Sequence, residues 1–550
     1  MIFIKKGLTL LITILMLLVA VPCSIVFAED EEGPLGKKSN LEELMIVYSC
    51  QDNNKDNDLI ISYQYFNSQF TTKYYTYDYN NFEEMVEIEE VNLSTKQKEK
   101  LNDFNSKVQI TYDDGIVDGD ECFTINVLKG KELNLYGFID DKFNSLISCT
   151  CNLKIVGKGT INTNLVTKPE NVSRVDKPTF NSASMLSDYM VIIDGKLSVG
   201  DDNSSLTMKL DTSDEGRLNR GLDGIKALEI KIKNTNLTIN VKTRAFAFEE
   251  NEFEPESDQL LIEDSKVSYS NKIFGLRDDD PRECALAKTI SNTSANITVK
   301  NSTLNININD PTENKSLIKE GNVIELNTDT NSEFNLINSK LDFQTNARVC
   351  FCSANIINIE NCKKVTCIQN DLAPLFTVRN FTIKNSNFNF ESAEQMFCVV
   401  APPEFTVSND ISQPSFEIIE ESDSYSGKMK IRKLVEEESG LLGLGDSVEK
   451  YIFPRATDPL ASRVSNDANI PFNTITITTK GNNVLKTYSA DNKLEKNANL
   501  SHEGNIHTFY FENGKEGNTP DKIAWRYFEL STTKKDNSSP RHEVLNTGVY

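Results

Sequence analysis

The sequence predicts an all-β protein built as a parallel β-helix, that is, a solenoid of stacked coils. Three observations support this prediction: a short strand-like phrase recurs along the chain, each copy ends on a residue suited to a tight turn, and the copies keep a long spacing. The turn positions advance by 37, 40, 30, 37, 37, 23, 24 and 24 residues. A strand-bearing repeat of this length is typical of solenoid proteins. The copies end at Gly157, Asp194, Asn234, Asp264, Asn301, Asn338, Asn361, Asn385 and Asn409.

The phrase itself has the period of a β-strand. Ile297-Thr298-Val299-Lys300 alternates apolar and polar residues before it reaches Asn301. Asparagine, aspartate and glycine tolerate the left-handed backbone in which a β-branched side chain would clash. A second short strand often follows, as in Leu304-Asn305-Ile306. We therefore predict a unit of strand, bend, strand and variable return, in which each strand pairs in parallel with its equivalent one unit away.

Stacked coils would bring the turn residues into a column. Asparagine side chains carry both a donor and an acceptor, so their amides could bond along this column. The alternative fold is an antiparallel sandwich with Asn-rich turns, because asparagine is common throughout the chain. Asp194 and Asp264 would substitute for asparagine in the column. The predicted ladder consists of Asn234, Asn301, Asn338, Asn361, Asn385 and Asn409.

The first residues have the form of a secretory signal. Lys5 and Lys6 precede an apolar run from Leu8 to Ala28, and small residues suit a cleavage site after position 28. An uncleaved N-terminal anchor is the alternative, because the run is long enough to span a bilayer. No later segment is apolar enough to cross a membrane. We therefore expect a secreted or cell-surface protein with no membrane span after signal removal.

Four parts are expected along the chain. Residues 1–28 form the signal peptide, and 29–104 form an acidic N-terminal cap region with one helix capped by Ser94 or Thr95. Residues 105–425 form the parallel β-helix, and 426–550 form a C-terminal cap or small β domain. The long returns are expected to emerge on one side of the solenoid. They are residues 165–187, 243–258, 273–294 and 308–322.

The charge of the chain restricts its partners. It carries 58 basic and 81 acidic residues, a net charge of −23. This balance argues against nucleic acid and against anionic membrane surfaces, and it disfavours a polyanionic ligand unless a cation bridges the two. An extracellular glycan or a host or matrix protein is the expected kind of partner.

The cysteines suggest disulfides rather than a metal centre. Ten remain after the signal, an even number that permits disulfides in an exported protein. Two pairs are spaced i, i+2, so members on a strand would share one face and bond an adjacent coil more readily than each other. A zinc site of Cys350, Cys352, Cys362 and Cys367 is a weaker alternative, because no CxxC is present. The disulfide candidates are Cys149, Cys151, Cys350, Cys352, Cys362 and Cys367.

Calcium is the one cofactor with a candidate site. Hard cations take clustered oxygen ligands, and the acidic run between 113 and 121 is the densest cluster in the chain. Its candidate ligands are Asp118, Asp120 and Glu121. A polar turn is the alternative interpretation.

Two phrases carry a family resemblance. Leu153 to Ile161 and Ile297 to Leu304 resemble coils of the pectate-lyase-like right-handed parallel β-helix superfamily, and the likeness covers about 105–425. The resemblance implies a right-handed β-helix. It does not select a function, because the superfamily contains lyases, polygalacturonases and bacterial surface adhesins.

The catalytic signatures of that superfamily are incomplete here. Asn327-Thr328-Asp329 matches one polygalacturonase motif, but the histidines all lie downstream of the repeat region. The run from Arg277 to Arg282 contains lyase-like residue types without the lyase spacing, and no residue is assigned a catalytic role. We therefore expect a non-enzymatic, adhesin-like binding or scaffold protein. The alternatives are a polysaccharide lyase or glycoside hydrolase with a divergent site, and a structural surface-layer component.

Overall fold

The computed structural model describes the following residues: 41–49, 58–77, 85–114, 121–139, 145–167, 188–212, 222–241, 243–248, 258–271, 285–289, 295–310, 321–326, 332–371, 373–393, 395–399, 415–420, 425, 427–431, 474–479, 483–489, 500–503, 506–510 and 525–532. The signal segment and the remaining residues lie outside this set. Among the described residues the fold is all-β, with one α-helix, α2 (Thr95–Asn105), and one short 3-10 helix, η1 (Glu90–Asn92).

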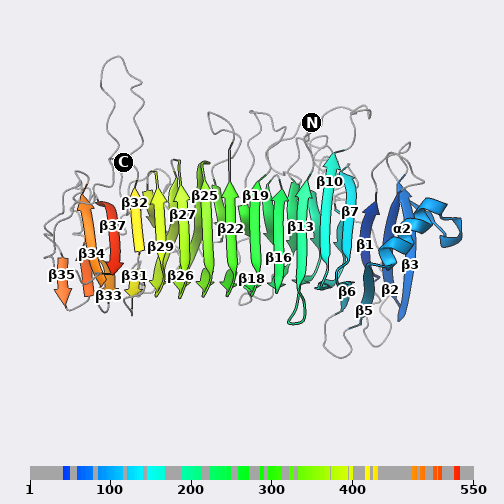
Figure 1. Cartoon of the computed structure of the whole chain (residues 1–550), viewed down its shortest axis with the longest axis horizontal. Coiled ribbons are helices and arrows are strands. Elements are labelled where there is room, and N and C mark those ends of the chain that lie inside the picture. Colours follow the sequence, from blue (N-terminus) through cyan, green and yellow to red (C-terminus); the bar gives the residue numbers. More distant parts are fainter. Residues whose placement is uncertain are drawn as a thin grey trace, which may run out of the picture. The chain divides into compact units, whose positions relative to one another are not determined.

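Most strands pair in parallel with the strand three places further along the chain. This rule sorts the repeat region into three faces, and successive strands pass from face A to face B to face C and back to A. Figure 1 shows the strands of the repeat region side by side. Face A consists of β6 (Cys122–Val127), β9 (Asn152–Gly157), β12 (Lys196–Val199), β15 (Glu229–Lys233), β18 (Asp258–Glu263), β21 (Asn296–Lys300), β24 (Glu333–Ile337), the second halves of β26 (Val349–Glu360) and β28 (Pro374–Lys384), and β31 (Ser415–Glu420).

The other two faces follow the same rule. Face B consists of β7 (Glu132–Ile139), β10 (Thr160–Thr167), β13 (Leu206–Thr212), β16 (Thr235–Val241), β19 (Lys266–Asn271), β22 (Thr303–Ile308), β25 (Lys340–Thr345), β27 (Lys364–Gln369), β29 (Phe388–Ser392) and β32 (Gly427–Ile431). Face C consists of β8 (Ile147–Cys149), β11 (Asp188–Ile193), β14 (Leu222–Ala227), β17 (Arg244–Phe248), β20 (Ala285–Thr289), β23 (Gly321–Glu325), the first halves of β26 and β28, and β30 (Gln395–Val399).

The long, parallel-dominated pairing is consistent with a solenoid in which three consecutive strands make one coil. The antiparallel sandwich does not account for it, because a sandwich pairs sequential strands in opposite directions. The expected unit was incomplete, however. Its variable return contains a third strand of its own, the face C strand of each coil.

Two of the segments expected to be long returns contain a face C strand. The segment 243–258 contains β17, and 273–294 contains β20. The chain between β10 and β11 and between β22 and β23 joins face B to face C, whereas the chain between β17 and β18 joins face C to face A. Most residues of the long returns lie outside the described set, so the expectation that they emerge on one side of the solenoid remains a prediction.

The bend between face A and face B has one left-handed residue. Asn301 has φ 50°, and Asn338 has φ 51°. The same conformation occurs at the other turns of the repeat, with φ between 48° and 55° at the non-glycine positions, namely Asn234, Asp264, Asn361 and Asn385.

The contacts that join successive bends are backbone hydrogen bonds and not the predicted side-chain amide bonds. The Asn301 N–H donates to the carbonyl of Ile337 at 3.0 Å, and the Asn338 N–H donates to that of Glu360 at 2.9 Å. The left-handed conformation is thus needed at each rung to aim the amide at the next coil. The column of asparagines marks these bends without itself forming the ladder.

A second column lies directly after the first, and it is buried. Ser302 donates its hydroxyl to the Lys300 carbonyl at 2.7 Å and accepts from the N–H of Ser265, one coil earlier, at 3.0 Å. The Ser302 N–H donates in turn to the Ser339 hydroxyl at 3.0 Å. These hydroxyls satisfy N–H groups that burial would otherwise leave unpaired. The column contains Thr235, Ser265, Ser302, Ser339, Cys362 and Ser386.

This hydroxyl ladder explains why one predicted copy of the phrase was wrong. Asp194 follows β11, which belongs to face C, and the face A strand of that coil is β12, whose turn residue is Gly200 with φ 78°. Asp194 is followed by glycine, whereas the true bends from Asn234 onward are followed by serine, threonine or cysteine. Asn409 lies outside the described residues. The strand that continues face A after β28 is β31, which begins after that phrase.

A substitution at one bend tests whether its backbone is left-handed. Replacing Asn338 by valine should cost about 1–2 kcal/mol of unfolding free energy, because a β-branched residue is strained in the left-handed region. Replacing Asn338 by glycine should cost less, because glycine adopts this conformation freely. Urea unfolding of the two variants measures the difference. Equal losses for valine and glycine would contradict the left-handed bend.

The interior between the faces is apolar. On faces A and B, alternate residues of the strands are buried, as with Ile230 and Ile232 in β15 and Leu237 and Ile239 in β16. Towards the end of the repeat the core becomes aromatic. Phe376 is fully buried, and its ring lies 5.0 to 5.8 Å from four others, those of Phe351, Phe381, Phe390 and Phe397.

The chain before the repeat is an antiparallel meander followed by the helix. Its strands are β1 (Glu42–Ser49), β2 (Leu59–Phe66), β3 (Gln69–Tyr77) and β4 (Met85–Ile88). Strand β1 pairs antiparallel with β8, and β5 (Val108–Asp113) pairs antiparallel with β6, so both strands meet the first coil. Ser94 caps α2 through a capping box with Gln97, as predicted, and Phe104 packs on Tyr48 with ring centroids 5.1 Å apart.

The chain after the repeat extends faces A and B with further strands. On face A, β33 (Thr474–Thr479) pairs parallel with β31, and β36 (Ile506–Tyr510) and β35 (Leu500–Glu503) follow in antiparallel order. On face B, β37 (Trp525–Thr532) pairs antiparallel with β32, and β34 (Asn483–Ser489) pairs with β37. The switch from parallel to antiparallel pairing marks the end of the coil pattern.

Candidate binding surface

Faces A and B present outward side chains in rows, whereas on face C the row that starts with Ser148, Ile192 and Lys226 is interrupted by buried residues such as Ala247 and Ser353. On face C whole runs of consecutive residues are buried, such as 245–248 in β17 and 349–355 in β26. On faces A and B the burial alternates, so every second residue points away from the core. In-register parallel pairing then aligns these outward residues from coil to coil, about 4.8 Å apart.

Five outward residues of face A next to the bends are charged and pair in two groups, which Ile337 separates. Glu263 lies between Lys233 at 3.2 Å and Lys300 at 3.3 Å, which come from the coils on either side. Hydrogen bonds from Lys233 and then Lys300 lower the pKa of the Glu263 carboxyl. Lys384 and Glu360 repeat the arrangement at 3.6 Å. The charges of this row are thus largely paired with each other.

The central row of face B is mostly neutral and polar, and it contains no apolar residue, whereas the matching row of face A includes Leu261. Strands β13 to β29 lie side by side in Figure 1 in the order that their register gives. Seven of the ten residues in the row are Asn, Ser or Thr, and the three charged ones are Lys209, Asp342 and Lys428. The row consists of Asn134, Asn162, Lys209, Thr238, Ser268, Asn305, Asp342, Thr366, Asn389 and Lys428.

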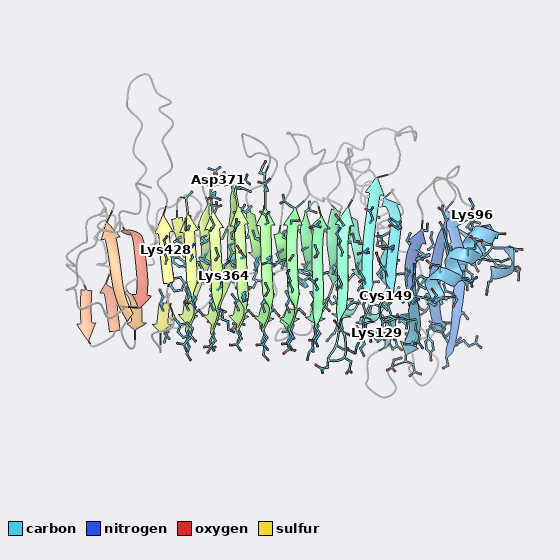
Figure 2. The ribbon with its side chains drawn as sticks, viewed as in Figure 1. Lys96, Lys129, Cys149, Lys364, Asp371 and Lys428 are labelled. Atoms are coloured by element: carbon cyan, nitrogen blue, oxygen red, sulfur yellow. The ribbon has the colours of Figure 1, made fainter. Side chains whose placement is uncertain are left out.

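Side chains of this row contact each other between coils. The Asn162 amide donates to the Asn134 carbonyl oxygen at 2.9 Å, and the Asn305 amide donates to the Ser268 hydroxyl at 3.2 Å. Lys364 and Lys428 project from β27 and β32 (Figure 2), and Lys364 pairs with Asp342 at 3.3 Å. The face therefore offers amide and hydroxyl groups at a regular spacing, already held in place by their neighbours.

Face C contains one charged cluster with a buried carboxylate. The Asp223 carboxylate, in β14, is fully buried and accepts from the Arg244 backbone N–H at 2.7 Å and from its guanidinium Nε and Nη2 at 2.9 and 2.6 Å. It also accepts from the Thr243 hydroxyl, and Arg244 Nη2 donates to the Tyr189 hydroxyl at 3.3 Å. These residues come from three successive coils, so the cluster ties the coils together.

The predicted calcium ligands are only partly within the described residues. Asp118 and Asp120 lie outside them. Glu121 precedes β6 and is exposed. In the described ranges no group of three or more His, Cys, Asp or Glu side chains is placed to hold a metal ion. The calcium site therefore remains a prediction.

Seven cysteines are free thiols, namely Cys122, Cys149, Cys151, Cys350, Cys352, Cys362 and Cys367. Cys352, Cys362 and Cys367 are fully buried in the core, and burial raises the pKa of Cys362 to about 11. Cys362 occupies a serine position of the hydroxyl ladder, where its thiol contacts the Glu360 carbonyl at 3.3 Å. The two sulfurs of one i, i+2 pair lie close together: Cys149 Sγ and Cys151 Sγ are 3.9 Å apart. The sequence predicted that each sulfur of such a pair would approach an adjacent coil, whereas these two sulfurs approach each other.

The residues weighed for catalysis fall outside the described structure. This holds for 327–329 and for 277–282. His502 and His507 lie opposite each other in β35 and β36, beyond the coils. No structural statement about a catalytic group follows from these positions.

Comparison with known proteins found no matching family, no similar curated protein and no similar solved structure. Within the described residues, no helix is long and apolar enough to cross a membrane. The proposals below therefore depend on the residues and geometry of this chain alone.

Proposed function

We propose that this chain is an exported, right-handed parallel β-helix of the pectate-lyase-like kind, which acts outside the cell or at its surface as an adhesin-like binding protein without catalysis. The proposed ligand is an extended neutral glycan, and the proposed site is the central row of face B. The export follows from the form of residues 1–28, and the handedness follows from the family resemblance.

The observation that carries the proposal is the composition of that row. Between Lys209 and Asp342 it runs through Thr238, Ser268 and Asn305 without a charge. Hydroxyl and amide groups can both donate and accept, as sugar hydroxyls do, so each coil can meet one part of a repeating polymer. The net charge of −23 disfavours a polyanionic polymer over a neutral one.

The test is binding of the purified full-length chain to an array of neutral and acidic glycans and matrix proteins. In the test variant, Ser268→Glu and Asn305→Glu place two carboxylates in adjacent coils of face B. In the matched control, Thr298→Glu and Asn335→Glu do the same in adjacent coils of face A. We expect the face B variant to lose at least about tenfold in affinity for a neutral glycan, because a buried sugar hydroxyl would face an unpaired charge. The control should keep its affinity.

Three outcomes would reject the proposal. The first is equal loss in both variants, and the second is binding only to a matrix protein or an acidic glycan. The third is release of reducing sugar or unsaturated product from any polysaccharide by the unaltered chain, which would favour the lyase or hydrolase alternative.

A further inference from the structure

A pair of thiols lies where the N-terminal strand meets the first coil. Cys149 ends β8 and Cys151 precedes β9, so the pair spans the corner between face C and face A. Their sulfurs are 3.9 Å apart, and both lie near the Asn152 carbonyl, at 3.8 and 3.6 Å. This corner differs from a straight strand, because the bend turns two side chains of one i, i+2 pair toward each other.

The residue between the two cysteines receives the N-terminal strand. The Thr150 N–H donates to the Glu43 carbonyl at 3.0 Å, and the Thr150 hydroxyl accepts from the Glu43 N–H at 2.8 Å. The same hydroxyl donates to the Glu42 carboxylate at 2.9 Å. Burial is the main cause of the raised pKa of Glu42. Any bond between the flanking thiols would therefore fix the backbone onto which β1 docks.

One other thiol near the pair could form a competing disulfide with either of its cysteines. Cys122 pairs in register with Asn152, the residue after Cys151, and its side chain is buried. On the other side, Gly195 of the next coil lies so close that an added Cβ would come within 2.8 Å of the Cys151 backbone. The corner is thus enclosed by backbone of the first and second coils, while Cys151 stays partly exposed.

We propose that Cys149 and Cys151 form an intrachain disulfide when the folded chain meets a low-molecular-weight disulfide oxidant, and that this bond fastens the corner on which β1 docks. Cys151 is the more exposed of the two, so its thiolate attacks the oxidant, breaks its S–S bond and forms a mixed disulfide. The Cys149 thiolate then attacks Cys151 Sγ and expels the second half of the oxidant. The two thiols lose two electrons and two protons, and the oxidant leaves as two thiols.

The electrostatics suggest a structural bond rather than a catalytic one. The hydrogen bond with Cys149, together with burial, raises the pKa of the Cys151 thiol above its ordinary value. The thiolate is the reactive form, so bond formation should be slow at neutral pH and about tenfold faster for each pH unit toward pH 9. The same raised pKa makes this sulfur a poor leaving group, which slows the reverse reaction. This proposal rests on the proposed export in one respect: export would bring the chain to the compartment that contains the oxidant.

The test is oxidation of the folded full-length chain with hydroxyethyl disulfide, followed by alkylation under denaturing conditions and tryptic mass spectrometry. The fragment Phe143–Lys154 contains only these two cysteines, and Cys122 falls in the separate fragment Val108–Lys129. We expect Phe143–Lys154 to appear two hydrogens lighter and without alkyl groups. Cys122→Ser should leave this product unchanged.

A built-in control comes from the other i, i+2 pair. Cys350 and Cys352 lie within the continuous strand β26, and Cys350 Sγ contacts the Leu375 carbonyl at 3.4 Å instead of a second sulfur. Their fragment, Val349–Lys363, should keep all of its thiols available for alkylation. The proposal is overturned if Phe143–Lys154 carries two alkyl groups, if it is cross-linked to Val108–Lys129, or if Val349–Lys363 oxidises equally fast. None of these results depends on whether the chain binds a glycan.

Discussion

Replacing Phe376 by alanine is expected to lower the unfolding free energy by about 3–5 kcal/mol, the cost typical of removing a large buried aromatic side chain. Phe376 is fully buried, and its ring contacts those of Phe351, Phe381, Phe390 and Phe397. The other four rings come from strands in at least two neighbouring coils, so a cavity here cannot be filled by one rotamer change. Urea unfolding followed by circular dichroism measures the loss.

Phe70 is the matched control for this substitution. It is the same residue type, but its side chain is 43% exposed and it stacks on Tyr63 at 5.9 Å in the N-terminal meander. Phe70→Ala should cost only about 1 kcal/mol, the order of one aromatic pair. If the two substitutions cost the same, Phe376 is not at the centre of a packed core.

Replacing Asp223 by alanine is expected to cost a similar amount, about 3–5 kcal/mol, for an electrostatic reason. The substitution removes the carboxylate that binds the Arg244 backbone N–H and guanidinium, and it leaves a mostly buried positive charge without this partner. Replacing both members, as in Asp223→Leu with Arg244→Met, should recover part of the loss, because no isolated charge then remains.

The exposed pair of Lys364 and Asp342 is the control for Asp223. Its atoms are 3.3 Å apart, but the two side chains are 60% and 34% exposed. Lys364→Met should therefore change the unfolding free energy by no more than about 1 kcal/mol. A loss for Asp223→Ala no larger than this would mean that the buried cluster does not hold the coils together.

The sequence predicted the face A strands and their bends because both leave a local signature. Alternation over five residues identifies a half-buried strand, and asparagine before serine, as at Asn301 and Asn338, identifies a left-handed bend followed by a buried hydroxyl. The serine half of this signature was available in the sequence and would have excluded Asp194. Asparagine or aspartate at the turn position does not by itself separate the face A bends from Asp194.

Most face C strands could not be found in the same way, because they do not alternate; β11 matched the phrase that ends at Asp194, but it was assigned to the wrong face. The runs 245–248 and 349–355 are buried on consecutive residues, so their apolar letters carry no period of two. The pairing of Asp223 with Arg244 was also beyond sequence reasoning, because it depends on register between coils. The same limit applied to Cys149 and Cys151, whose approach depends on the corner between β8 and β9.

The stacking of the coils can be measured most directly by distances between spin labels along face B, introduced as unnatural amino acids so that the native cysteines stay in place. Thr238 and Asn389 are five coils apart in the central row, and Asn134 and Asn389 are eight coils apart. With about 4.8 Å between neighbouring strands, double electron–electron resonance should give about 24 Å and about 38 Å between the backbone positions. Distances that follow the number of coils would support the stack of in-register coils. Distances that do not grow in this proportion would contradict it.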